Sequence, residues 1–100
     1  MVMRYDRVFV QPVQNIAPAV LAEIIRRQPA SKERTAFAWS VAVGPALARV
    51  TTIDLRDRTL TVTARDPRWA RELDRARETI LARLQHLLGR DAVEDISIHA

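Results

Sequence analysis

The spacing of apolar residues changes three times along this 100-residue chain, and this pattern constrains the fold more than any other feature. From about residue 15 to residue 48, apolar residues recur every three or four positions, as in amphipathic helices. Residues 50–65 alternate apolar and polar side chains, as in half-buried strands. Helical spacing returns over 66–88, and alternation returns over 93–99. The pattern predicts the order helix, helix, strand, strand, helix, strand.

The first helix is predicted from about Asn15 to Gln28. Asn15 is a suitable N-cap, and Pro18 falls in the first turn, where its missing N–H costs nothing. Pro29 ends the helix. The apolar residues that recur at helical spacing in this segment are Ile16, Ala17, Val20, Leu21, Ile24 and Ile25. Before it, Tyr5 to Val13 is interpreted as either a short strand or an ordered arm.

A second helix is predicted from about Ser31 to Val43. Gly44-Pro45 interrupts it, and a further helical turn is expected over residues 46–48. Trp39 is most simply interpreted as a core residue of this helix, and an exposed platform for stacking is the alternative interpretation.

Two strands, Val50 to Arg56 and Thr59 to Arg65, are predicted to form a hairpin. The two residues between them, Asp57-Arg58, lack the glycine that such a turn favours at its second position. Because this arrangement strains the turn, Arg58 is interpreted as present for its charge. The segment Val93 to His99 is predicted to be a third strand.

A single long helix is predicted from Asp66, its N-cap, to Gly89, its C-terminal cap. Its apolar stripe consists of Trp69, Leu73, Ala76, Ile80, Leu84 and Leu87. A three-stranded sheet with helices covering one face buries all of these stripes. The sequence therefore predicts one α+β domain over residues 15–100, preceded by an arm at 1–14.

Positive charge is the main functional signal. Lys and Arg total 16 against 12 acidic residues, for a net charge of +4, which favours a polyanionic partner. Lys32 is the only lysine, and arginine pairs bidentately with phosphate. At 100° per residue, Arg68, Arg71 and Arg75 share one sector opposite the apolar stripe, and Arg65 extends the row.

A second basic cluster brackets the first interhelix turn, and it consists of Arg26, Arg27, Lys32 and Arg34. The candidate nucleic-acid-binding residues are Lys32, Arg34, Arg65, Arg68, Arg71 and Arg75. They would contact the phosphate backbone, with affinity that falls as salt rises. An ordinary solvated surface is the alternative interpretation.

Nothing in the sequence favours catalysis. The chain has no cysteine, which excludes disulfides and cysteine-based metal or catalytic sites. His86 and His99 lie in no recognisable triad, and Asp74 and Glu78 are interpreted as parts of a salt-bridged face. No glycine-rich phosphate loop is present. We therefore expect no enzyme activity, metal or cofactor.

The sequence also contains neither a signal peptide nor an apolar run of about 20 residues. We therefore expect a cytoplasmic protein without a membrane span.

Several motifs resemble the DciA family of bacterial replicative-helicase loaders. They are Trp39 to Thr51 (WSVAVGPALARVT), the hairpin Leu55…Leu60-Thr61-Val62, Trp69-Ala70-Arg71-Glu72-Leu73, Arg83-Leu84-Gln85…Leu88-Gly89 and Val93…Ile96-Ser97-Ile98. The resemblance covers nearly the whole chain from Ala17 onward. It departs at the hairpin, which in the family usually reads Asp-Gly.

The resemblance implies a KH-like fold without the Gly-x-x-Gly loop with which KH domains clamp nucleic acid. It implies a non-catalytic partner of the replicative helicase DnaB that helps to load it on single-stranded or forked DNA. It also implies that Trp39 and Trp69 are core residues. Two alternatives remain open: a KH-like protein that binds ribosomal or structured RNA, and a self-associating structural domain whose arginines only solubilise it.

Overall fold

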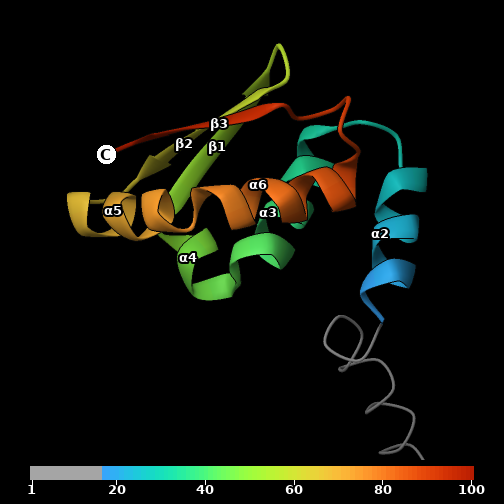
Figure 1. The fold of residues 1–100 in the computed structure, drawn as a ribbon, viewed down its shortest axis with the longest axis horizontal. Coiled ribbons are helices and arrows are strands. Elements are labelled where there is room, and N and C mark those ends of the chain that lie inside the picture. The colour runs from blue at the N-terminus through green and yellow to red at the C-terminus, as the bar shows by residue number, and fades with distance from the viewer. Residues whose placement is uncertain (1–16) are drawn as a thin grey trace, which may run out of the picture.

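The computed structural model describes residues 17–100 (Figure 1). The elements are the helices α2 (Pro18–Arg27), α3 (Lys32–Val43) and α4 (Pro45–Arg49), the strands β1 (Thr51–Arg56) and β2 (Thr59–Ala64), the helices α5 (Pro67–Arg75) and α6 (Arg77–Leu88), and the strand β3 (Asp95–His99). The predicted α+β class, with a three-stranded sheet packed against helices, is confirmed. The predicted arm at 1–14 lies outside the described residues.

Local capping chemistry determines where the first helices begin and end. The N-cap of α2 is Ala17, so the predicted start at Asn15 is wrong, although Pro18 does occupy the first turn. The Ser31 side chain caps α3 by accepting a 3.0 Å hydrogen bond from the Arg34 N–H. Gly44, at φ 90°, separates α3 from the short α4 as expected, because this backbone conformation is strained for any residue with a Cβ.

The prediction of one long helix over 66–88 is wrong, because α5 and α6 are separated at Ala76. The Ala76 N–H bonds to the Leu73 carbonyl at 3.1 Å, which is an i→i−3 bond that tightens the end of α5. The two helices pack differently: α5 contacts β2 and β3, whereas α6 contacts α2 and α3 most extensively and β3 to a smaller extent. Leu73 on α5 and Ile80 on α6 are both buried, as the predicted apolar stripe requires.

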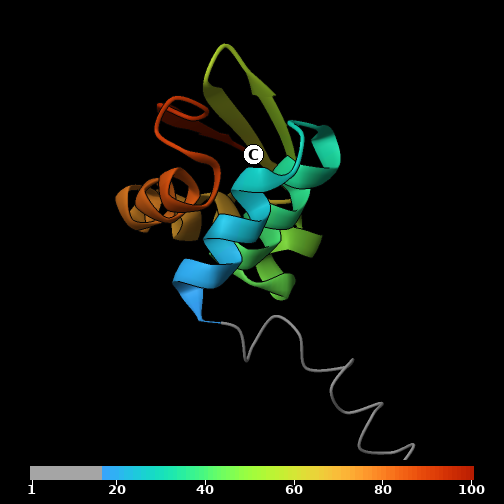
Figure 2. The ribbon, with the colours of Figure 1, turned by 90° about the vertical axis from the view of Figure 1, so that its right-hand side faces the viewer.

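The sheet has the order β1-β2-β3, with β1 antiparallel to β2 and β2 parallel to β3. The parallel pair needs a crossover, which α5 and α6 supply. Alternation places one face inward: Ile53 pairs with Val62, and Leu60 pairs with Ile96. The helices lie on this face, and the projecting hairpin extends beyond them (Figures 1 and 2).

Both residues of the hairpin turn have positive φ, 50° at Asp57 and 65° at Arg58. The Arg58 side chain forms an ion pair with Glu94 at 2.9 Å, and the Arg58 carbonyl accepts a 2.7 Å hydrogen bond from the Glu94 N–H. The charge of Arg58 therefore connects the turn to the segment that enters β3.

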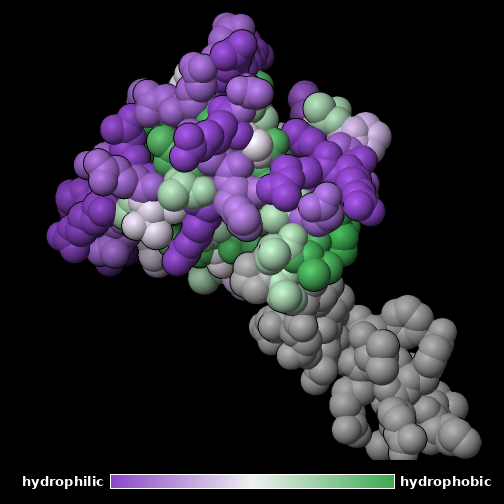
Figure 3. Space-filling model, turned by 45° about the vertical axis from the view of Figure 1, so that its right-hand side comes forward, coloured by the Kyte–Doolittle hydropathy of each residue, from purple (hydrophilic) through white to green (hydrophobic). Residues whose placement is uncertain are grey.

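The core lies between the helices and the inner face of the sheet. Its fully buried larger side chains are Ile25, Leu60, Leu73, Leu84, Ile96, Val62 and Val93. Not every apolar residue that recurs at helical spacing in the first helix is buried, because Val20 is 53% exposed and Ile24 is 44% exposed. The helix α2 contacts α6 (Figure 2), and its buried residues are Leu21, Ala22 and Ile25. Apolar side chains are visible at the surface beside the polar ones in Figure 3.

Candidate nucleic-acid interface

The helix α5 presents three arginines to solvent. Asp66 caps this helix through Oδ1, which accepts hydrogen bonds from the N–H groups of Arg68 at 2.8 Å and Trp69 at 3.4 Å. With Leu73 turned into the core, Arg68, Arg71 and Arg75 are exposed, as predicted. This local geometry is preserved despite the break at Ala76, because all three arginines precede the break.

The α5 arginines line an open groove with a volume of ≈ 440 Å³. We call it the α5 groove. Its lining residues are Arg68, Trp69, Arg71, Glu72 and Arg75. Two acidic side chains pair with its arginines: Glu72, itself in the lining, pairs with Arg75 at 3.4 Å, and Asp66 pairs with Arg68 at 3.8 Å. These pairs are exposed and therefore weak, so they compete poorly with a phosphate group.

Arg71 forms no ion pair with any residue in the range 17–100. Arg65 is also exposed, directly before the Asp66 cap. Its N–H donates to the Val50 carbonyl at 2.8 Å, which holds its backbone at the end of the hairpin. The row of four arginines therefore extends from the end of β2 along α5.

The two tryptophans occupy different environments. Trp39 is only 3% exposed, so its interpretation as a core residue is confirmed. Trp69 is only partly buried: it packs against the core and also lines the α5 groove. Its interpretation as a core residue is therefore incomplete. Its position next to Arg68 and three residues before Glu72 was the signal in the sequence that could have placed it on the basic surface.

The second basic cluster lies at the other end of the molecule, because α5 and α2 occupy opposite ends of the long axis in Figure 1. Arg26 donates to the His86 carbonyl at 2.6 Å, and Arg27 pairs with Glu23 at 3.6 Å. Arg34 donates to the Gln28 carbonyl at 3.2 Å, while Lys32 is exposed. The structure does not bring Lys32 and Arg34 together with the α5 groove, and their assignment to DNA stays a prediction.

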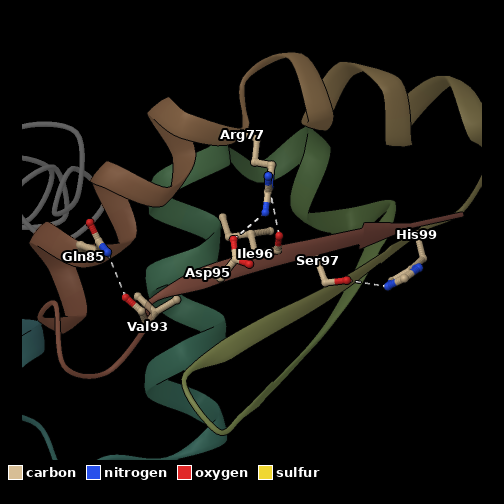
Figure 4. Close-up of polar contacts among 7 residues, drawn as sticks. All are labelled: Arg77, Gln85, Val93, Asp95, Ile96, Ser97 and His99. Carbon is tan, nitrogen blue, oxygen red and sulfur yellow. Dashed lines mark hydrogen bonds and ion pairs between the residues drawn. The ribbon is translucent and has the colours of Figure 1, made fainter.

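Over residues 17–100, no three side chains of His, Asp or Glu gather closely enough to hold a metal ion. On β3, Ser97 Oγ lies 2.7 Å from His99 Nε2 at an exposed position (Figure 4). No carboxylate among the described residues forms a hydrogen bond with His99. None of the described helices combines the length and hydropathy that crossing a bilayer requires.

A family model described as "Dna[CI] antecedent, DciA" matches residues 12–98 of the chain. No curated protein and no solved structure gives a significant match. The family match covers every helix and strand described above except the last residue of β3.

Proposed function

Because the chain belongs to the DciA family, whose role is related to DNA replication, we propose that it binds the replicative helicase DnaB and helps to load it on single-stranded DNA. In this proposal the protein acts as an adaptor in the cytoplasm and catalyses no reaction. The observation that carries the DNA-binding part is the α5 groove, where arginines and a tryptophan share one exposed surface.

The arginines of this surface suit phosphate contacts. The guanidinium groups of Arg68, Arg71 and Arg75 point to solvent from successive turns of one helix, and Arg65 precedes them. Such contacts supply affinity without reading the base sequence, which a helicase loader does not need to read. They also make binding sensitive to salt, because each neutralised phosphate releases counterions.

Trp69 favours a single strand over a duplex. Trp69 lines the same groove as the arginines and is only partly buried, so in this proposal a base whose phosphates contact those arginines stacks on the indole. In a duplex the flat faces of the bases are already stacked on one another, and only the phosphates remain available. The combination of a stacking ring and basic side chains is typical of proteins that bind single strands.

The element order supports a KH-like fold as part of this proposal. A KH domain clamps the nucleic-acid backbone with a Gly-x-x-Gly loop, whereas the two glycines of this chain, Gly44 and Gly89, lie far apart. Affinity for DNA must therefore come from side chains, and the arginines of α5 are placed to supply it.

The test of the adaptor role is native mass spectrometry of the purified chain with its cognate DnaB hexamer. We expect a complex at micromolar concentrations, and the absence of a complex would refute the adaptor role. A second measurement compares helicase recruitment to a forked DNA with and without the chain, and we expect recruitment to rise.

The same preparation distinguishes DNA from RNA. Affinities for a single-stranded DNA and an RNA of matched sequence are compared, because only RNA carries the 2′-hydroxyl that a protein can recognise. Equal or tighter binding of DNA supports the proposal. A clear preference for RNA would favour the alternative, a KH-like RNA-binding protein.

A further inference from the structure

The two edges of the sheet differ in how they are covered. At the β3 edge, a side chain of α6 satisfies a backbone carbonyl: Arg77 Nε donates to the Ile96 carbonyl at 3.0 Å (Figure 4). Just before the strand, Gln85 Nε2 of α6 donates to the Val93 carbonyl at 3.1 Å. Among the described residues, α3 and α4 contact β1 and Trp39 donates to the Thr51 hydroxyl, but no side chain donates to a backbone carbonyl of β1. An uncovered strand edge can pair with another chain.

The register shows which backbone groups of β1 are unpaired. The Arg65 N–H bonds to the Val50 carbonyl at 2.8 Å, so residue 50 is in a hydrogen-bonded position of the antiparallel pair. Alternation then places Ile53 and Leu55 in non-hydrogen-bonded positions, with their N–H and C=O groups directed away from β2. Neither residue forms another backbone hydrogen bond within residues 17–100.

A groove of ≈ 560 Å³ runs beside this edge, and we call it the β1 groove. Residues 53–56 of β1 form one wall, and the start of α3, with Lys32 and Thr35, contributes the other. Inward-facing Ile53 and outward-facing Asp54 both line it, so the groove reaches the edge of the strand. Ala92, in the segment before β3, also lines it, so the groove extends from this edge along the inner face of the sheet. Its size is typical of binding clefts.

Charge favours an acidic occupant. Lys32, Arg34 and Arg56 line the β1 groove, and its only carboxylate, Asp54, already pairs with Arg56 at 2.9 Å. Lys32 forms no ion pair within residues 17–100. The Arg34 Nε atom is buried without a hydrogen-bond partner among the described residues. The N-terminus of α3 adds the positive end of a helix dipole.

We propose that the β1 groove binds an extended acidic segment of a partner protein, which adds beside β1 as a fourth strand. Main-chain hydrogen bonds to Ile53 and Leu55 hold the segment, and its carboxylates face Lys32. A second copy of this chain is a poorer occupant, because it would bring a second set of the same cations to the groove. The site is separate from the α5 groove and does not depend on the proposed contact with DNA.

The test uses the isotope-labelled full chain and an end-capped peptide of seven alternating valine and glutamate residues. We expect the amide resonances of Ile53 and Leu55 to shift and their hydrogen exchange to slow. Two control peptides are expected to bind much more weakly: one carries N-methyl groups on alternate backbone amides, and the other has lysine in place of glutamate. Equal binding of the N-methylated peptide would overturn pairing with the strand edge.

Two charge reversals locate the site. Lys32→Glu, on the first turn of α3 where an acidic residue suits the helix dipole, is expected to weaken peptide binding about tenfold. Arg71→Glu makes the same charge change in the α5 groove and should leave peptide affinity unchanged while it weakens DNA binding. Equal losses of peptide affinity in both variants would show a net-charge effect and refute the groove.

The oligomeric state of the free chain completes the test. Sedimentation over a range of concentrations is expected to show a monomer whose Ile53 and Leu55 amides exchange freely. A dimer in which these two amides are protected would assign the edge to a second copy and overturn the proposal. The DNA affinity of Arg71→Glu is measured separately from its peptide affinity. Failure of the DNA proposal and failure of the peptide proposal therefore cannot be confused.

Discussion

The indole N–H of Trp39 donates a 2.9 Å hydrogen bond to Oγ1 of Thr51, and this hydroxyl donates in turn to the Leu47 carbonyl at 2.9 Å. The pair joins α3 to the junction between α4 and β1. Because Trp39 is 3% exposed, its polar atom has little access to water and depends on this partner. This hydrogen bond therefore fixes the start of β1 against α3, in addition to the packing of the hairpin on the helices.

Replacement of Thr51 by valine tests this contact. Thr51→Val keeps the shape of the side chain but leaves the indole N–H unpaired, so we expect the free energy of unfolding to fall by about 1–3 kcal/mol. Urea denaturation measures the change, and Thr51→Ser, which keeps the hydroxyl, serves as the control. A double-mutant cycle with Trp39→Phe should show non-additive losses, and additive losses would mean that the two side chains are not coupled.

The triple variant Arg68→Gln, Arg71→Gln and Arg75→Gln tests the α5 groove. Each phosphate contact to a single strand contributes about 0.7 to the slope of log affinity against log salt, so we expect the slope to fall by about 2. Fluorescence anisotropy of a labelled oligonucleotide at several salt concentrations measures it. The matched control removes the same charge from exposed arginines elsewhere: Arg27, Arg49 and Arg90. An unchanged slope in the α5 variant would mean that Arg68, Arg71 and Arg75 only solubilise the protein.

Trp69→Leu tests base stacking separately from charge. Stacking on an aromatic ring contributes about 1–3 kcal/mol per base, so the affinity for single-stranded DNA should fall while the affinity for a duplex changes little. A thermal denaturation curve of the variant checks that the fold is retained, because Trp69 also packs against the core. Parallel losses on both DNA forms would show that Trp69 supports the helix and does not contact a base.

Arg58→Gly tests the hairpin turn. A left-handed conformation costs a residue with a Cβ roughly 1–2 kcal/mol, and glycine removes this cost. The greater flexibility of glycine in the unfolded chain offsets roughly 0.5–1 kcal/mol of the stability gained. The lost ion pair with Glu94 is exposed and weak. We therefore expect a small increase in thermal stability. Arg58→Ala keeps the strain and loses the ion pair, so it should be less stable than the wild type, and the reverse ranking would contradict the strained turn.

The candidate site was predictable only where one element carries it. Arg68, Arg71 and Arg75 lie on a single helix, and a spacing of 100° per residue is enough to place them together. The partial exposure of Trp69 was not predictable, since it depends on how α5 sits against β2 and β3. The same holds for Lys32, whose neighbour across the β1 groove is a strand more than twenty residues later in the chain.

The sequence by itself determined the type and order of most elements, because apolar periodicity, proline, glycine and capping residues act within a few positions of one another. It also determined that the inner face of β2 carries Leu60 and Val62. Only the tertiary structure decided that the helix over 66–88 breaks at Ala76 and that Val20 and Ile24 remain exposed. Both depend on which surfaces of other elements are close enough to bury an apolar side chain, and the spacing of residues along the chain does not contain that information.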